Sequence, residues 1–406
     1  MSTACMQDWF DFTSDRFISF NFLMTKRLMF SGAIAWLGAA LPFGGVACAQ
    51  TQAGSQMADD VFKNIQVLKG LTVDEFMGTM GLFSAALNVC CGDCHVGAGG
   101  SNPQWDKDVP RKVVARKMIA MVSAINKNNF GGAQMVTCWT CHRGSGAPAT
   151  TPGIDAIYSD PVSTPPDILP QATNGTKVPS ATEILDKYIQ ALGGADKLAK
   201  LTSYTAKGTS MLFGEDKGDP AEIFAKAPDQ LATIVQEREG TMERVYDGHD
   251  AWVMLPLTVV QEYQLHASAL EGAKLDGQMA FPGNIKTFFT TWRVSYPTTF
   301  PNEKDPEKKD DIYVVQGTRP PGFAATFYFD QKTGLLRRMV RYANSVVGRV
   351  PTQYDYTDYR PVAGVLMPFK WTFGWVSGRE EYALTEVQPN APVDASKFAK
   401  PVPKAK

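Results

Sequence analysis

Two short segments of the sequence contain the residue types that can attach a redox cofactor covalently. The segments "CGDCH" at 91–95 and "CWTCH" at 138–142 use four of the seven cysteines and two of the four histidines. C-x-x-C-H is the pattern of c-type haem attachment, in which both thiols form thioethers with the haem vinyl groups and the imidazole ligates iron. The pattern predicts two covalently bound haem c groups, attached through Cys91, Cys94, Cys138 and Cys141, with His95 and His142 as iron ligands.

The same four cysteines admit a structural alternative. Paired C-x-x-C units also form zinc ribbons, and four thiols could form two disulfides. Zinc ribbons usually have a shorter spacer than the one between these motifs, and they do not require a histidine directly after the second cysteine. The repeated histidine therefore favours haem attachment over zinc binding.

Methionines upstream of each motif are candidates for the sixth ligand of the iron. A thioether stabilises Fe(II) and raises the reduction potential, as in electron-transfer cytochromes. Met80 lies 11 residues before Cys91, and Met118 and Met121 lie 20 and 17 residues before Cys138. Each is on the apolar face of an expected helix, where ordinary core packing is the simpler interpretation. We predict Met80 on the first iron and Met118 on the second, with Met121 as the alternative to Met118.

Arg143 follows the second motif directly. A guanidinium fork suits a carboxylate, and a partly buried haem propionate needs a partner. We therefore predict that Arg143 pairs with a propionate of the second haem, the alternative being a solvated loop arginine.

Helices are expected to position both motifs. Apolar residues at helical spacing predict a first helix over 61–68. Thr72 and Glu75 form a capping box that begins a second helix, which leads to the first motif. A third helix is expected from Pro110 toward the second motif, and its apolar face consists of Val114, Met118, Met121 and Ile125. The order of helix, methionine and motif occurs twice, which indicates an internal repeat in the physical sense.

In the remainder of the chain, the composition changes first and the spacing of the apolar residues changes after it. Residues 144–179 contain seven prolines with Ser, Thr and Gly, which predicts an extended linker. A further capping box at Ser180 begins a helix. From Ser203 onwards apolar residues alternate with period two between turn sequences, which predicts an antiparallel sheet. The sequence thus indicates an α+β protein, with an all-α dihaem domain over 57–143 and a β-rich domain with one or two helices over 180–398.

Residues 1–49 have the features of an export signal. A basic pair at 26–27 precedes an apolar run over 28–47, and an A-x-A cleavage pattern ends at Ala49. The residues before Met24 include acidic side chains and fit no export pattern, so we expect translation to start at Met24. Cleavage predicts a periplasmic protein. Without cleavage the apolar run is long enough to anchor the chain in the membrane, facing the periplasm.

The first part of the chain resembles the cytochrome c subunit family of photosynthetic reaction centres, especially its short exported members. The resemblance covers roughly residues 57–150 and rests on "FKNIQVLKGLTVDEFMGTMGLFSAAL", the first C-x-x-C-H, "ARKMIAMVSAINKNNFGG" and "VTCWTCHRG". It implies that a methionine of the preceding helix binds each haem iron, which falls on Met80 and Met118. This sequence has two motifs where other members of the family have four, so a long series of haems and docking on a reaction centre are not expected.

The second part resembles the half-barrel of lipoprotein-localisation carriers, an antiparallel sheet curled around a helix with an apolar hollow. The resemblance rests on "ILDKYIQALGGADKLAKLTSYTAKGT", "VYDGHDAWVM", "FYFDQKTGLLRRMVRY" and "YTDYRPVAGVLMPFKWTF". It implies a hollow lined by Phe and Trp that could hold an acyl chain or a quinone-like ligand. A filled core that only docks partners is the alternative, since fold does not determine function.

The sequence as a whole predicts a periplasmic dihaem c-type cytochrome that passes single electrons between redox protein partners and is not an enzyme. The β-rich domain would provide docking or bind an apolar ligand or lipid. The alternatives are a haem sensor or peroxidase-like enzyme with one open iron, and a lipid or lipoprotein carrier with accessory haems. His249 and His266, the other histidines, sit in no catalytic pattern. The formal net charge of −1 predicts no nucleic-acid partner.

Overall fold

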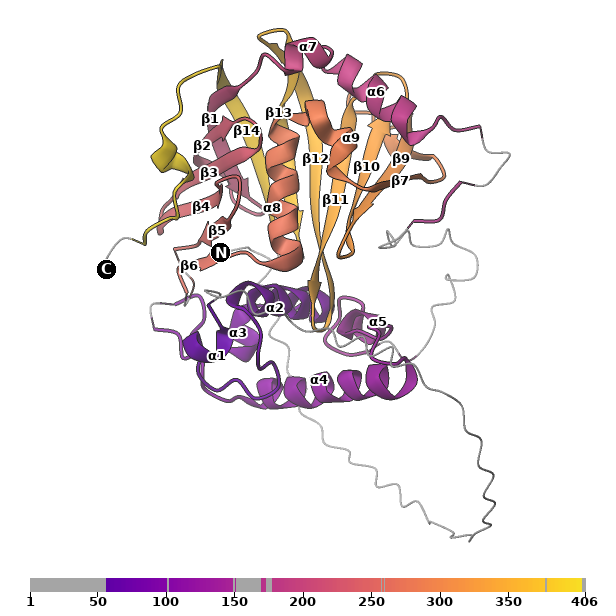
Figure 1. Ribbon diagram of the computed structural model, residues 1–406. Coiled ribbons are helices and arrows are strands. Elements are labelled where there is room, and N and C mark those ends of the chain that lie inside the picture. The colour runs from indigo at the N-terminus through magenta and orange to yellow at the C-terminus, as the bar shows by residue number, and fades with distance from the viewer. Residues whose placement is uncertain are drawn as a thin grey trace, which may run out of the picture. The chain divides into compact units, whose positions relative to one another are not determined.

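The computed structural model describes residues 56–100, 102–148, 150, 169–172, 177–256, 258, 260–376 and 378–403 (Figure 1). The predicted export signal therefore lies outside the described residues, as does most of the predicted linker. Within the described residues, helices occupy the part of the chain that contains both motifs, and a large antiparallel sheet occupies the part that follows. The α+β fold class predicted from the sequence is confirmed.

Within the described residues, the part of the chain up to the second motif contains five helices, and two of them are single turns that contain the motifs. They are α1 (Ala58–Val61), α2 (Val73–Leu87), α3 (Cys91–Cys94), α4 (Pro110–Asn129) and α5 (Cys138–His142). The predicted capping box begins α2, because Glu75 accepts a hydrogen bond from the backbone N–H of Thr72 at 3.1 Å. Pro110 begins α4 as predicted, since a helix tolerates proline in its first turn.

The helix predicted over 61–68 is wrong. The helical turn α1 ends at Val61, and Asn64 adopts the left-handed conformation with a φ of 61°. The Asn64 side chain donates hydrogen bonds to the backbone oxygen of Asp106 at 2.6 Å and to Asp108 at 2.9 Å. Asparagine tolerates this conformation better than most residues, and its distant partners hold the chain in a turn.

A single antiparallel sheet contains the described strands. They are β1 (Ser203–Leu212), β2 (Asp219–Lys226), β3 (Gln230–Glu237), β4 (Gly240–Tyr246), β5 (Ala251–Met254), β6 (Glu262–Gln264), β7 (Thr291–Val294), β8 (Thr298–Pro301), β9 (Lys309–Arg319), β10 (Phe323–Asp330), β11 (Leu336–Ser345), β12 (Gly348–Val362), β13 (Val365–Trp375) and β14 (Gly378–Pro389). The order across the sheet is β6-β5-β4-β3-β2-β1-β14-β13-β12-β11-β10-β9-β7, and β8 pairs with β9. Because β1 and β14 are neighbours, the first and last strands join two antiparallel meanders.

Helices pack on this sheet. They are α6 (Ala181–Ala191), α7 (Ala195–Leu198), α8 (Ala267–Ala280) and α9 (Ile285–Phe288), with 3₁₀ turns at Pro282–Asn284 and Ala395–Phe398. The sequence predicted one or two helices here, so this number is corrected. Figure 1 shows α8 in front of the sheet between its two halves, and α8 contacts β3, β4 and β11.

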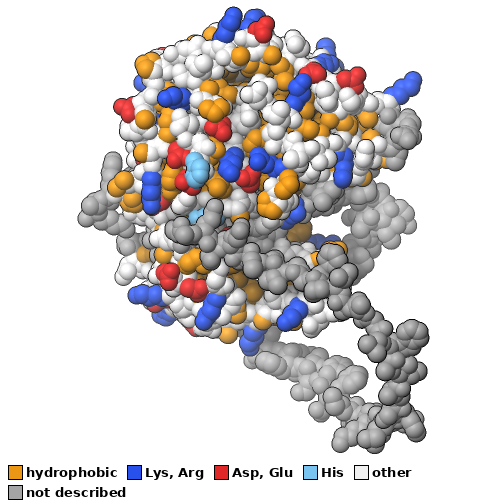
Figure 2. All heavy atoms as spheres, viewed as in Figure 1, with side chains coloured by type: hydrophobic (Ala, Val, Ile, Leu, Met, Phe, Trp, Pro, Cys, Tyr) orange, Lys and Arg blue, Asp and Glu red, His pale blue; other side chains and the backbone are white. Residues whose placement is uncertain are grey.

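The main hydrophobic core lies between the sheet and these helices. Leu185 of α6, Leu275 of α8 and Phe327 of β10 are at most 1% exposed. Part of the predicted linker also joins the sheet, because Leu169 is buried and its backbone oxygen accepts a hydrogen bond from Arg293 at 3.1 Å. Acidic and basic side chains are interspersed over the face seen in Figure 2. None of the helices in the described ranges is long and apolar enough to cross a membrane.

Candidate haem-binding sites

The first motif forms one helical turn, α3, that presents two thiols and an imidazole. Cys91 and Cys94 are three residues apart, so their side chains lie on the same face of the turn. The backbone N–H of His95 donates to the carbonyl of Cys91 at 2.8 Å and closes the turn. Cys91 is exposed and Cys94 is half-buried, and burial raises the pKa of the Cys94 thiol. This spacing is what two thioether bonds to one planar ring require.

The imidazole of His95 is oriented by a backbone carbonyl. Its Nδ1 lies 3.1 Å from the oxygen of Trp105. A carbonyl can only accept, so Nδ1 carries the proton and the lone pair of Nε2 is left for a metal. Burial lowers the pKa of His95, which favours the neutral imidazole that ligates iron. Lys112 also donates to the Trp105 oxygen, at 2.7 Å, so one carbonyl joins the motif to α4.

The second motif repeats this arrangement. It forms the turn α5, and the Nδ1 of His142 lies 3.0 Å from the backbone oxygen of Ser145. The same argument leaves Nε2 of His142 free to bind a metal. The second motif also contacts α2, because the backbone N–H of Gly144 donates to the carbonyl of Ala86 at 3.0 Å. In both histidines predicted to ligate iron, Nδ1 is therefore held by a hydrogen bond to a backbone oxygen.

The methionine candidates differ in their surroundings. Met80 is half-buried on α2 and packs in a cluster with Phe62, Phe76 and Phe83. Met118 and Met121 are 37% and 45% exposed on α4. On α4 the buried residues are Val122 and Asn126, so the apolar stripe that contains Met118 and Met121 is not the side that packs on the protein.

The residues present fit two haem c groups. The chain supplies two thiols and one imidazole with an available Nε2 at each motif, together with thioethers on the helices before them. It also supplies an apolar stripe on α4 that is exposed over Val114 (53%) as well as over Met118 and Met121. A haem face is large and apolar and would cover such a stripe.

Arg143 occupies the position after α5. Its backbone is left-handed with a φ of 52°, and its N–H donates to the carbonyl of Trp139 at 3.1 Å. The side chain is exposed, and within the described residues it forms no ion pair. The structure thus leaves the guanidinium available, and its pairing with a propionate remains a prediction.

Several residues that support the motifs were not anticipated from the sequence. Asp93, inside the first motif, accepts a hydrogen bond from the backbone N–H of Cys90 at 2.8 Å and forms an ion pair with Arg111 of α4. The Trp105 carbonyl and Lys112 hold His95 as described above. No local pattern marks these residues, because their roles arise from main-chain atoms and from contacts across a loop.

A buried pair links α2 to the sheet region. Asp74 of α2 accepts hydrogen bonds from the backbone N–H of His266 at 2.7 Å and from its Nδ1 at 3.1 Å. The Asp74 and His266 side chains are 2% and 9% exposed. The hydrogen bond that His266 donates to Asp74 is the main reason that the pKa of His266 is raised, and burial opposes it. His249 differs, since its side chain is 88% exposed.

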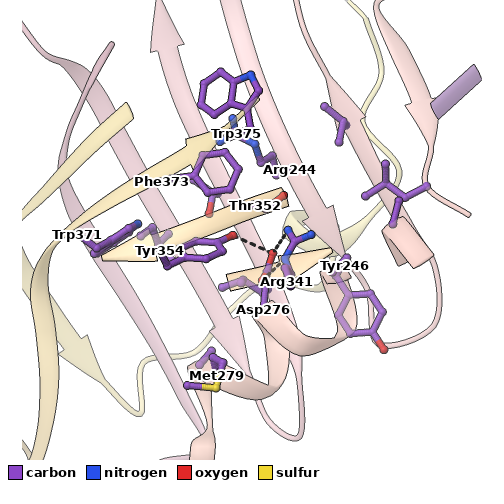
Figure 3. Close-up of a pocket in the computed structure, with 18 of the residues that line it drawn as sticks. Arg244, Tyr246, Asp276, Met279, Arg341, Thr352, Tyr354, Trp371, Phe373 and Trp375 are labelled. Carbon is purple, nitrogen blue, oxygen red and sulfur yellow. Dashed lines mark hydrogen bonds and ion pairs between the residues drawn. The ribbon is translucent and has the colours of Figure 1, made fainter. Parts of the chain in front are cut away.

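A cavity of about 610 Å³ adjoins the same helix. Its wall includes Met77 and Gly78 of α2 and the aromatic side chains of Trp371, Phe373 and Trp375 on β13. Figure 3 shows Tyr354 and Arg341 converging on Asp276 in this wall. The hollow lined by Phe and Trp that the second resemblance implied is therefore present.

These features describe an α+β protein whose helical part contains two c-type haem attachment motifs. Residues 40–181 match the family model of the photosynthetic reaction centre cytochrome C subunit. The chain is 36% identical over 105 residues to the photosynthetic reaction center cytochrome c subunit of Roseobacter denitrificans, and 36% identical over 104 residues to that of Thermochromatium tepidum. The resemblance predicted for the first part is confirmed, and the helical part is similar to c-type cytochromes.

These relatives are matched over a limited length. The alignments cover 24% of this chain, 28% of the Roseobacter protein and 25% of the Thermochromatium protein. Among solved structures, a LolA superfamily protein from Nitrosomonas europaea is 16% identical, with a TM-score of 0.36 over 55% of this chain and 99% of its own. A DUF1329 family protein from Desulfovibrio piger is 10% identical, with a TM-score of 0.36 over 54% of this chain and 96% of its own.

Proposed function

We propose that this protein is a periplasmic c-type cytochrome that holds two haem c groups and passes single electrons between redox protein partners. The observation that carries the proposal is the repeated geometry of His95 and His142. In each motif Nδ1 is hydrogen-bonded to a backbone oxygen, which leaves the lone pair of Nε2 available to a metal next to a turn that contains two thiols. A zinc site formed by the four thiolates would need neither imidazole.

The roles of the chain's own residues follow from this arrangement. Cys91 and Cys94 would attach the first haem and Cys138 and Cys141 the second, while Met80 and Met118 would provide the sixth ligands. When bound, each haem iron supplies one-electron redox chemistry, and the protein sets its potential through ligands and burial. The Trp105 and Ser145 carbonyls fix the imidazole rings, and the phenylalanines around Met80 exclude water.

The proposed division of the chain is an export signal over 1–49, a dihaem domain over 57–143, a linker over 144–179 and a β-rich half-barrel domain over 180–398. The half-barrel would bind an apolar ligand or dock partners, and the cavity supports the first of these roles. Export would place the protein in the periplasm, close to the membrane if the signal is retained. Arg143 would pair with a propionate of the second haem.

Intact mass and optical spectra of protein produced with a cytochrome maturation system test this proposal. The expected mass corresponds to the chain without residues 1–49 and with two haems, and the expected reductive titration shows two one-electron steps. Single variants Cys94→Ala and Cys141→Ala should each weaken or abolish one attachment. A colourless, zinc-loaded protein from the same system would overturn the proposal. A stoichiometric carbon monoxide complex of the reduced protein would instead favour a sensor or peroxidase-like enzyme with one open iron.

A further inference from the structure

Helix α2 has two different faces. Phe76, Met80 and Phe83 pack in the apolar cluster of the helical part. Met77, Gly78 and Gly81 line the cavity on the sheet side. A helix is about 10 Å across with its side chains, so a molecule in the cavity would lie one helix diameter from the cluster that contains Met80. The cavity is thus built partly from the helix that carries a proposed iron ligand.

The arginines in the cavity wall are already paired with carboxylates. Arg341 donates from Nε and Nη2 to the two carboxylate oxygens of Asp276 at 3.0 and 2.7 Å. Arg244 donates to both oxygens of Glu380 at 3.2 and 3.0 Å. An anionic head group would need an uncompensated cation, because burying an unpaired charge is costly. The wall therefore favours a ligand without a charge.

Two tyrosine hydroxyls in the wall open onto the cavity. Tyr188 of α6 and Tyr204 of β1 are 3% and 7% exposed, and both line the cavity. Within the described residues neither hydroxyl forms a hydrogen bond, and neither oxygen is among the enclosed side-chain atoms without a partner, so both face open space in the cavity. An acceptor oxygen on a ligand can take a hydrogen bond from each of them. A phenol donates, so the ligand should carry carbonyl-type oxygens.

The remaining wall suits a flat or chain-like apolar body. Trp371, Phe373 and Trp375 of β13 and Tyr354 of β12 face the cavity (Figure 3). The volume of about 610 Å³ lies within the range of about 300–1,000 Å³ that is usual for small-molecule sites.

We propose that this cavity binds an uncharged apolar molecule that carries carbonyl oxygens, seated against α2. The inference deepens the apolar-ligand role proposed above and rests on it. Two membrane sources share this chemistry, the prenylated quinones and the neutral acyl esters. The acceptor oxygens would meet the hydroxyls of Tyr188 and Tyr204, and the apolar body would contact β13 and Met77.

Two glycine variants provide a matched test of the location. A Cβ added at Gly78 would have only the Val350 side chain within 4 Å, at 3.9 Å, so Gly78→Leu extends into the cavity without a clash. A Cβ added at Gly374 meets only the Gln353 carbonyl, also at 3.9 Å. Gly374 lies between Phe373 and Trp375, so strand alternation points its substituent to the opposite face. The two substitutions add the same side-chain atoms, one at the cavity wall on α2 and the other on the face of β13 that points away from the cavity.

Binding is measured by equilibrium dialysis of the full-length haem-loaded protein against decylubiquinone, monolauroylglycerol and laurate. Both neutral probes should bind, laurate should bind on the order of tenfold more weakly, and Gly78→Leu should weaken the neutral probes on the order of tenfold. Gly374→Leu should leave binding unchanged. Tyr188→Phe should weaken binding roughly threefold through loss of one hydrogen bond. A preference between the neutral probes identifies the quinone or the ester as the source.

The outcomes separate this inference from the proposed electron transfer. Laurate binding as tightly as the neutral probes would overturn the uncharged ligand while leaving an apolar-ligand role. Equal affinity of Gly78→Leu and Gly374→Leu would overturn the location. Absence of binding by all three probes would remove the ligand role altogether. Haem content and redox titration, which do not depend on the cavity, would still decide the proposed electron carrier.

Discussion

The helical part and the sheet part of this protein bury their apolar residues in different ways. In the sheet part, Phe327, Leu275 and Met339 have no exposed surface, and the core closes between strands and helices. In the helical part, Met135 and Val114 are 63% and 53% exposed. Large exposed apolar surface on a soluble protein usually marks a binding site. The difference teaches that the sheet part buries its largest apolar side chains between strands and helices, whereas the helical part leaves an apolar stripe on α4 that the proposed haem would cover.

Removing haem attachment from the second motif should give the largest effect. In the double variant Cys138→Ala/Cys141→Ala, the stripe of α4 loses the group that would cover it, so we expect α4 to lose its protection against hydrogen exchange. The strands of the sheet should keep theirs. Mass spectrometry with hydrogen exchange measures both regions in one sample, and intact mass verifies the loss of one haem. Equal protection of α4 with and without the second haem would contradict the comparison.

Truncation of a side chain in the sheet core should destabilise the sheet and leave the haem sites unchanged. Phe327 is fully buried among the rings of Phe289, Trp292 and Phe329. We expect Phe327→Ala to lower the free energy of unfolding of the sheet by about 4 kcal/mol, while the haem absorbance at both sites is retained. Phe213→Ala is the control, because Phe213 is 56% exposed and its loss should cost about 0.5 kcal/mol or less. Denaturant titration followed by hydrogen exchange of the strands and by haem absorbance measures the two regions separately.

The contribution of the Asp74–His266 pair to the free energy of unfolding should depend on pH. Asp74→Ala leaves the buried His266 without its partner, and we expect a loss of about 3 kcal/mol near pH 6. Asp74 raises the pKa of His266 above its ordinary value of 6.5, so the charged pair contributes fully below that value. Its contribution is lost as pH rises through the raised pKa, so the difference between variant and parent should shrink as pH rises above 6.5.

Urea titrations of Asp74→Ala and the parent across this pH range measure the change. His249→Ala is the control, since the His249 side chain is 88% exposed and its removal should alter stability little at any pH. A constant difference between Asp74→Ala and the parent across the range would show that the histidine does not titrate in the pair, which contradicts this prediction.

The smallest expected effect distinguishes two methionines on the same helix. Met118→Ala should open the second iron to carbon monoxide in the reduced protein without a large change in stability, since Met118 is 37% exposed. Met121→Ala should leave carbon monoxide binding unchanged and serves as the matched control. Optical spectra of the reduced proteins with and without carbon monoxide measure the difference. The reverse result would assign the second iron to Met121.

Features specified by neighbouring residues could be predicted from the sequence. The capping boxes at Thr72 and Ser180 form as expected, and each C-x-x-C-H forms a helical turn. Both depend on contacts within a few residues. The break at Asn64 could not be predicted, because it depends on hydrogen bonds to residues more than 40 positions away.

Helix α8 was missed for a related reason. Its sequence contains Gly272 and Gly277, which weaken a helical pattern. A Cβ at Gly272 would collide with the Arg341 guanidinium, and one at Gly277 would collide with the backbone of Asp229. The glycines are therefore required by the close approach of α8 to the sheet, which no local pattern reveals. The partners of Asp74 and the wall of the cavity are likewise long-range, and the Trp105 carbonyl that orients His95 has no side-chain signature.

The bond between Asp74 and His266 also sets an order of events as the chain is made. The two residues are 192 positions apart, and domains generally fold as the N-terminal part emerges first. The partner of Asp74 therefore becomes available only when all of β1 to β6 has followed α2 along the chain. Both C-x-x-C-H motifs precede that point in the sequence. A chain cut before His266 would contain both motifs and would lack the residue that joins α2 to the sheet.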